Sequence, residues 1–173
     1  MTPIVLFGLQ FTLSLAVYAL IAAWYVAPRL ARLPRETALQ PLLWVHAFRV
    51  VGGTILAPFA VGAGVTVAFQ RMIGFGDMIT ALLAVLALIA IRTRLPGAIA
   101  LTWTVLGVGM LDTVNAIIQS MRNNVFTHAL GVNWVIVTAY VPALLVSSFL
   151  MVVQLLRPAA VTVAAEPTTL IDS

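Results

Sequence analysis

The chain has 173 residues, of which 62% are hydrophobic and only 8% are charged, and its formal net charge is +4. Soluble domains are about 45–50% apolar and about 25% charged, so this composition excludes a soluble globular domain and a disordered regulator. A surface this apolar is stable in lipid. The chain has no cysteine, which excludes disulfides, thiolate metal sites and cysteine nucleophiles.

Five apolar runs follow one another along the chain, separated by arginine, glycine and proline. They predict helices at about residues 3–27, 41–69, 75–91, 97–121 and 128–156. Apolar helices of about 20 residues cross a hydrocarbon core of about 30 Å. We therefore expect an all-α, five-helix transmembrane bundle that forms one domain over residues 1–157, followed by a disordered cytoplasmic tail at 158–173.

The arginines between the runs predict the orientation of the bundle. Six lie in the first and third connections and after the last helix, and two lie in the second and fourth connections: Arg29, Arg32, Arg35, Arg92, Arg94 and Arg157 against Arg71 and Arg122. Because cytoplasmic loops carry an excess of basic residues, the N-terminus is expected outside and the C-terminus in the cytoplasm. The composition is typical of a bacterial chain, which predicts a multi-pass protein of the inner (plasma) membrane.

The second run has a stripe of small residues at three- and four-residue steps. Its members are Gly53, Ala57, Ala60 and Gly64. On a helix these residues share one face and allow a neighbouring helix to approach closely. The expected partners are therefore the lipid bilayer and either a second copy, giving a dimer, or another protein of a membrane complex. No nucleic acid is expected, because the arginines lie at helix ends, where they face headgroups.

Ionisable residues inside the runs are the strongest candidates for a site. An arginine or aspartate near the centre of a membrane helix costs roughly 2.5–3.5 kcal/mol, so such residues usually face the bundle interior and pair with one another. We expect a buried polar cluster of Arg49, Asp77, Asp112, Asn115 and His46. A purely structural ion pair is the alternative to a functional site.

A GxGD sequence at Gly74–Asp77, the second aspartate Asp112 and a PAL sequence at Pro142–Leu144 resemble the intramembrane aspartyl proteases of the presenilin and prepilin-peptidase type. The resemblance implies Asp77 and Asp112 as catalytic residues that share a proton. The chain departs from that pattern, because Asp112 follows the GxGD sequence instead of preceding it, Asp77 is expected near the outer surface, and five helices are few for that chemistry. The alternative is a turn with Asp77 capping the next helix.

A longer set of fragments resembles a group of small, functionally uncharacterised bacterial multi-pass membrane proteins. It runs from residue 41 to residue 156 and comprises Phe48-Arg49, Gly52, Pro58-Phe59-Ala60, Gly74–Asp77, Leu106-Gly107, Leu111-Asp112 and Tyr140-Val141-Pro142. The resemblance implies that Arg49, Asp77 and Asp112 belong together as a polar set, and it implies no activity.

The two histidines provide a weaker alternative, because two axial haem ligands must lie at one depth on facing helices. His46 is expected near the inner side and His128 near the outer side, which leaves only a single-histidine haem or quinone site. No metal-ligand cluster is recognisable, so no metal and no cofactor are expected. The sequence favours a small transporter or a channel-like, proton-linked component over an enzyme. A structural or accessory subunit of a membrane complex is the main alternative.

Overall fold

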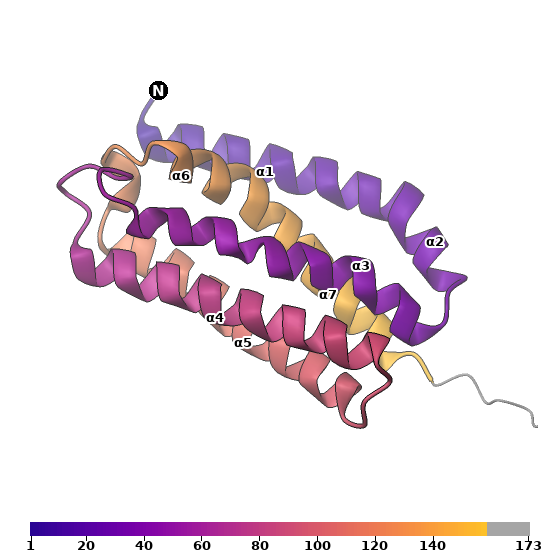
Figure 1. Ribbon diagram of the computed structural model, residues 1–173. Coiled ribbons are helices and arrows are strands. Elements are labelled where there is room, and N and C mark those ends of the chain that lie inside the picture. Colours follow the sequence, from indigo (N-terminus) through magenta and orange to yellow (C-terminus); the bar gives the residue numbers. More distant parts are fainter. Residues whose placement is uncertain (159–173) are drawn as a thin grey trace, which may run out of the picture.

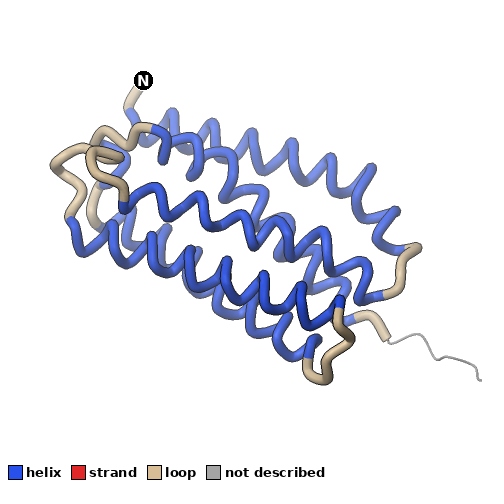
Figure 2. Tube along the Cα trace, viewed as in Figure 1, coloured by secondary structure: helices blue, strands red, loops and turns tan. Residues whose placement is uncertain are grey.

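The structure is a computed structural model that describes residues 1–158. Apart from Pro158, the predicted tail at 158–173 therefore lies outside the described residues. Within the described part, every regular element is helical (Figure 2). Five helices are long and apolar enough to cross a membrane, by length and composition: Pro3–Ala31, Arg35–Leu56, Val67–Arg92, Ala98–Arg122 and Val132–Leu156. These five spans are compatible with an integral, multi-pass membrane protein.

Three of the five spans change helix type along their length. The first span comprises α1 (Pro3–Ile21), a π-helical turn (Ala22–Val26) and α2 (Ala27–Ala31), and the second comprises α3 (Arg35–Ala47) and a 3-10 helix (Phe48–Leu56). The third and fourth spans are α4 (Val67–Arg92) and α5 (Ala98–Arg122). A short 3-10 turn (Val125–Thr127) precedes the fifth span, which comprises α6 (Val132–Val135), a π-helical turn (Ile136–Tyr140) and α7 (Val141–Leu156).

Both π-helical turns have the same local cause. Pro28 and Pro142 each lie two residues beyond the end of a π turn. A proline has no N–H to donate, and its ring crowds the carbonyl one turn earlier, so that turn widens. The two spans therefore continue past a proline with a local change in helix type.

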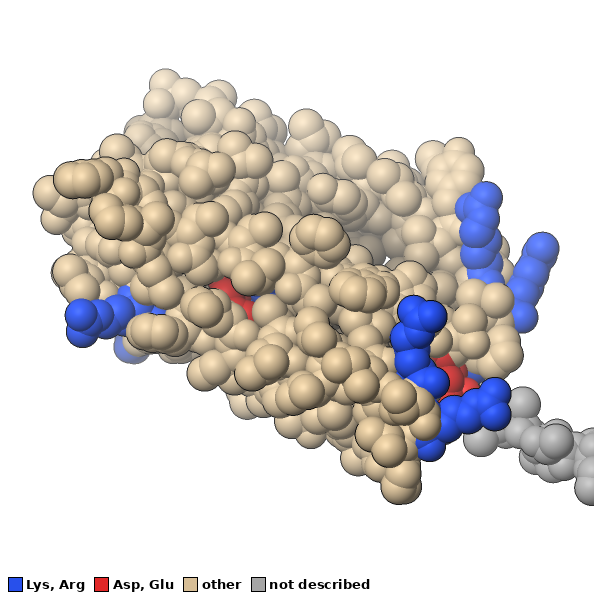
Figure 3. Space-filling model, viewed as in Figure 1, with Lys and Arg blue, Asp and Glu red and all other residues tan. Residues whose placement is uncertain are grey.

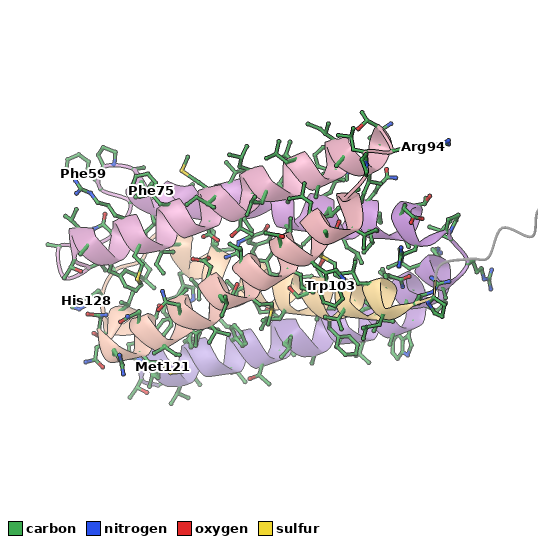
Figure 4. All side chains as sticks on the ribbon, turned by 90° about the horizontal axis from the view of Figure 1, so that it is seen from below. Phe59, Phe75, Arg94, Trp103, Met121 and His128 are labelled. Carbon is green, nitrogen blue, oxygen red and sulfur yellow. The ribbon has the colours of Figure 1, made fainter. Side chains whose placement is uncertain are left out.

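The spans run antiparallel to their neighbours in sequence (Figure 1). One end of the bundle holds the N-terminus and the connections 57–66 and 123–131, and we call it the loop end. The opposite end holds the connections after α2 and α4 and the end of α7, and we call it the arginine-rich end. Phe59 and His128 lie at the loop end, and Arg94 lies at the arginine-rich end (Figure 4).

Helix α4 is central to the packing, because it contacts α3, the 3-10 helix and α5, while α1 lies against the fifth span. The larger apolar core joins α3, α4, α5 and α7 in the half nearer the arginine-rich end. Leu39, Leu43, Val105 and Met151 are fully buried there. A second, smaller core at the loop end is built around Phe7 stacked on Phe126, whose ring centroids are 3.9 Å apart.

The second span differs from the predicted range of 41–69, since it begins at Arg35 and ends at Leu56. Pro41 lies inside α3 instead of starting it. The helix ends where it does because Pro58 forces the preceding residue out of the helical region, and Ala57 is extended (φ −68°, ψ 142°). Phe59 then adopts a left-handed conformation (φ 63°), which completes the break.

The third span also differs from the predicted range of 75–91, because α4 begins at Val67, where the Thr66 hydroxyl caps the Phe69 N–H at 3.3 Å. The GxGD residues 74–77 therefore lie inside a helix and form no turn, and the expectation of Asp77 as a helix cap is wrong. The segment 57–66 misled the prediction because it is itself apolar, so hydropathy did not separate it from the helices.

Candidate functional site

Three spans place Arg49, Asp77 and Asp112 side by side. Asp77 lies ten residues after the start of α4, and Asp112 lies ten residues before the end of α5. At 1.5 Å per residue, both carboxylates are therefore roughly 15 Å from the loop end. They share one depth because α4 starts earlier than predicted. Arg49 reaches them from the 3-10 helix, which packs on α4.

The Arg49 guanidinium is fully engaged by neighbouring acceptors. Nε donates to Asp77 Oδ1 at 2.8 Å, and Nη2 lies 2.7 Å from the same oxygen and also hydrogen bonds Asp112 Oδ2. Nη1 donates to the Gly109 carbonyl at 3.1 Å and to Thr113 Oγ1 at 2.9 Å. These pairings match the five N–H groups that a guanidinium carries. We call Arg49, Asp77 and Asp112 the Arg49 cluster.

Glycines make the close approach of the two carboxylates possible. A Cβ added to Gly52 would lie 1.8 Å from Asp77 Oδ2, and one added to Gly76 would lie 1.9 Å from Asp112 Oδ1. Any side chain at either position would therefore displace a carboxylate from Arg49. The second glycine of the GxGD sequence, Gly76, therefore lies within α4 and leaves room for the Asp112 carboxylate of α5.

The cluster is buried but remains in contact with a cavity. Arg49 is 3% exposed, whereas Asp77 and Asp112 are 15% and 14% exposed. All three residues line a cavity of about 80 Å³ whose other walls extend toward the loop end, where they include Phe69, Val125, Phe126 and Leu130. A water molecule needs about 10–15 Å³ of such space and two or more polar partners, so the polar part of the cavity can hold water. Acidic atoms also reach the side of the bundle between its two basic ends (Figure 3).

The two carboxylates are close to each other, but the guanidinium lies between them. Since Asp77 Oδ1 and Asp112 Oδ2 both contact Nη2 of Arg49, these two oxygens are less than about 6 Å apart. A protease dyad needs one carboxylate to hydrogen bond to the other through a shared proton. Within residues 1–158 no hydrogen bond joins Asp77 directly to Asp112. Here each carboxylate is paired with Arg49.

Two other predicted members of the polar cluster have different positions. His46 is fully buried next to the cluster, where its Nε2 is 3.5 Å from Ser148 Oγ and its Nδ1 has no partner among the described residues. Asn115 does not join the cluster, because it is exposed on α5 and its Nδ2 lies 3.4 Å from Met72 Sδ. The sequence register placed Asn115 on the Asp112 stripe, but residues three apart are still offset by about 60° around the helix, and this offset turns Asn115 toward Met72 and away from Arg49.

The predicted small-residue stripe does not form one helix face. Only Gly53 lies in a helix, where a Cβ would be 3.4 Å from the Met78 side chain. Ala57, Ala60 and Gly64 lie beyond the helix end, and the loop they belong to packs on the other loop of the same end. The Gly62 N–H donates to the Ala129 carbonyl at 2.7 Å. These residues therefore join two connections instead of two helices.

His128 belongs to that loop contact and lies against Gly64. It is at the loop end, whereas His46 lies inside the bundle beside Arg49, so the structure does not bring the two histidines together. Among residues 1–158, no group of three or more His, Asp or Glu side chains is placed to hold a metal ion.

Several residues of the site were given no role by the sequence analysis. Thr113 accepts from Arg49 and itself donates to the Gly109 carbonyl at 2.8 Å. Tyr140, which lines the cavity, donates to the Val45 carbonyl at 2.5 Å and ties the fifth span to the second. A usable signal for Thr113 was its position four residues after Gly109, which puts both on the helix face that meets Arg49. Gly52 and Gly76 belong to the fragments shared with the uncharacterised group, but nothing in the sequence indicated that they make room for the two carboxylates.

The chain belongs to the family described as a domain of unknown function, DUF8737, which matches residues 6–156. No curated protein and no solved structure matches the chain. Membership fits the expected relation to an uncharacterised family, and the family description assigns no membrane pattern and no activity.

Proposed function

We propose that this chain is a small integral membrane protein whose Arg49 cluster takes up and releases a proton or another small cation, as part of a transporter or a channel-like, proton-linked component. The observation that carries the proposal is the imbalance of charge in the cluster. Two carboxylates meet one guanidinium beside a cavity. With all three groups charged, the cluster has one excess negative charge inside a membrane span.

An uncompensated charge at this depth is unfavourable, and it is removed by a proton or by a bound cation. Asp77 Oδ2 and Asp112 Oδ1 accept no hydrogen bond from residues 1–158, and they are the atoms at which either could bind. Asp112 is our candidate for the cation-responsive group, because it is held by one guanidinium nitrogen whereas Asp77 is held by two.

The same geometry argues against an anion-binding site at Arg49. Its N–H groups already have acceptors within the bundle. A substrate anion would have to displace a carboxylate that carries the same charge. Arg49 therefore serves to hold the two carboxylates in place.

The proposal includes an orientation, with the N-terminus outside and the C-terminus in the cytoplasm of a bacterial inner membrane. It is supported by the placement of the arginines, because those before α3, after α4 and after α7 all lie at the arginine-rich end. The excess of basic residues on the cytoplasmic side would place that end inside the cell.

The test is proton flux in proteoliposomes with a pH-sensitive dye inside and an imposed potential, negative inside. Wild-type protein should acidify the lumen faster than protein-free liposomes, and Asp112→Asn should return the rate to the protein-free value. Gly107→Ala is the matched control, because a Cβ at that position on the same helix meets nothing within 4 Å. Equal rates for wild type, both variants and empty liposomes would contradict the proposal.

An accessory or structural subunit is the second candidate, and the first span favours it. Over Pro3–Ala31 only Phe7, Ala22 and Leu30 are buried, so most of this helix is open to lipid or to another protein. Purification from its native membrane with a second protein at fixed stoichiometry, together with absent flux, would support this candidate.

A further inference from the structure

The cavity beside the Arg49 cluster has two chemically different parts. Its polar part is formed by Arg49, Asp77 and Asp112 with Thr113. Most of the remaining wall is apolar, and three aromatic rings contribute to it: Phe69, Phe126 and Tyr140. A site of this kind fits a ligand with one polar end and one apolar end.

The polar part selects the sign of the ligand charge. Four hydrogen bonds and an ion-pair contact between Nη2 and Asp77 Oδ1 engage every nitrogen of the Arg49 guanidinium, so a ligand anion would have to compete with these acceptors. Ionised carboxylates only accept hydrogen bonds. Oδ2 of Asp77 and Oδ1 of Asp112 accept none from residues 1–158, so both oxygens are available to a ligand donor. An ammonium group has three donors and a positive charge, so it complements both features.

The apolar part of the cavity determines the chemistry and size of the rest of the ligand. A bare inorganic cation would leave the surfaces of Phe126, Leu130 and Val137 without a partner, whereas a short alkyl chain would cover them. The aromatic faces also attract cations. An apolar cavity of about 150 Å³ holds benzene, which has six heavy atoms, so about 80 Å³ corresponds by proportion to about three heavy atoms, the size range of ethylammonium and propylammonium.

We propose that this cavity binds a small amphipathic cation, with an ammonium group at Asp77 and Asp112 and a short alkyl chain toward Phe126. The inference rests on the proposed function, in which the cluster responds to a cation, and it names the substrate class of that site. Acidic atoms are visible on the side of the bundle (Figure 3), so part of the polar end of the site is accessible from outside the bundle.

The probe is propylammonium chloride, compared with sodium propionate and 1-propanol, which have similar size but carry a negative charge or none. Binding is measured by ligand-observed NMR and by thermal shift on the full chain in nanodiscs of uncharged lipid with a constant sodium chloride background. We expect propylammonium to bind at least about tenfold more tightly than either analogue. Ammonium chloride should also bind at least about tenfold more weakly, because it has no chain to bury.

Two variants locate the binding. Asp112→Asn keeps an oxygen that can accept from Arg49 but removes the excess negative charge, and it should weaken propylammonium at least about tenfold. Ala116→Leu fills the cavity wall and leaves the charges intact, so it should abolish binding. Ala100→Leu is the matched control on the exposed face of the same helix and should bind as wild type does. Thermal unfolding of each variant shows that it is folded.

Three results would overturn the inference: equal binding of propylammonium and 1-propanol, ammonium binding as tightly as propylammonium, or wild-type binding in folded Ala116→Leu. Proton flux that depends on Asp112, with no propylammonium binding, would remove this substrate class and leave the proposed function standing. Absent proton flux, together with propylammonium binding that is lost in Asp112→Asn, would remove the proton-linked function and leave the binding inference standing.

Discussion

The two halves of the bundle are packed differently. In the half nearer the arginine-rich end, Leu43, Ala84, Val105 and Met151 are fully buried in one apolar core. In the half nearer the loop end, the core around Phe7 and Phe126 is smaller, and the cavity of about 80 Å³ lies beside it. The Arg49 cluster lies where the two halves meet. The comparison indicates that one half supports the fold and the other leaves space next to charged groups.

The largest expected effect is the loss of stability when the Arg49 cluster, which lies between the two halves, loses its arginine. Arg49→Ala leaves two buried carboxylates without their donor, and removing one partner of a buried ion pair costs about 3–5 kcal/mol. We expect little folded protein, measured by recovery and by thermal unfolding in detergent. Arg122→Ala, at an exposed position, is the control. Equal stability of the two variants would show that the halves do not depend on the cluster.

A pair of truncations compares the halves directly. Met151→Ala removes a fully buried side chain from the packed half and should reduce the free energy of unfolding by about 2–5 kcal/mol. Ile117→Ala, on the cavity wall, should cost about half of that or less, because its half-buried side chain already faces open space. Chemical denaturation in detergent measures both. A larger loss at Ile117 would reverse the comparison.

Glycine substitutions test the fit of the cluster. Gly76→Ala places a methyl group against Asp112 and should destabilise the protein by about 1–3 kcal/mol. Gly107→Ala meets open space and should be neutral or should stabilise by up to about 1 kcal/mol through helix propensity. Thermal unfolding distinguishes them, and identical behaviour would mean that the carboxylate is not held against Gly76.

The smallest expected loss of stability concerns the hydrogen bond that joins the fifth span to the second beside the cavity. Tyr140→Phe removes the hydrogen bond to the Val45 carbonyl and should cost about 0.5–1.5 kcal/mol. Because the ring remains, the cavity wall is preserved and propylammonium binding should persist. Unfolding and propylammonium binding are measured on the same sample. A loss of binding with unchanged stability would show that the Tyr140 hydroxyl contacts the ligand and does not tie the two spans.

The sequence was sufficient for the helical class and for the ionisable residues that meet. Charges within apolar runs need partners, which is why Arg49, Asp77 and Asp112 could be grouped without coordinates. The positions of the other two predicted cluster members, Asn115 and His46, were harder to predict. Asn115 points away from the cluster, and His46 lies beside it with an Nδ1 that has no partner among residues 1–158. A stripe on one helix does not show which neighbour faces it.

Helix ends were the weakest part of the prediction. The segment 57–66 carries no charged residue and is largely apolar, so the backbone preference of Ala57 before Pro58 was the main mark of the break. Eight residues of α4 were consequently missed, and Asp77 was placed too near the surface. The role of Gly52 and Gly76 depends on distances across helices, which no local pattern contains.

The central claim, a water-accessible and negatively charged cavity in one half of the bundle, can be tested by single-cysteine labelling, because the chain has no cysteine of its own. Ala116→Cys lies on the cavity wall, and Ala84→Cys lies in the packed half. The thiolate of an accessible cysteine attacks water-soluble thiol reagents and is labelled by them. We predict that Ala116→Cys reacts in intact proteoliposomes, faster with a cationic reagent than with an anionic one of equal size, and that Ala84→Cys stays unlabelled. Equal labelling of the two sites, or faster reaction of the anionic reagent at Ala116→Cys, would contradict the account.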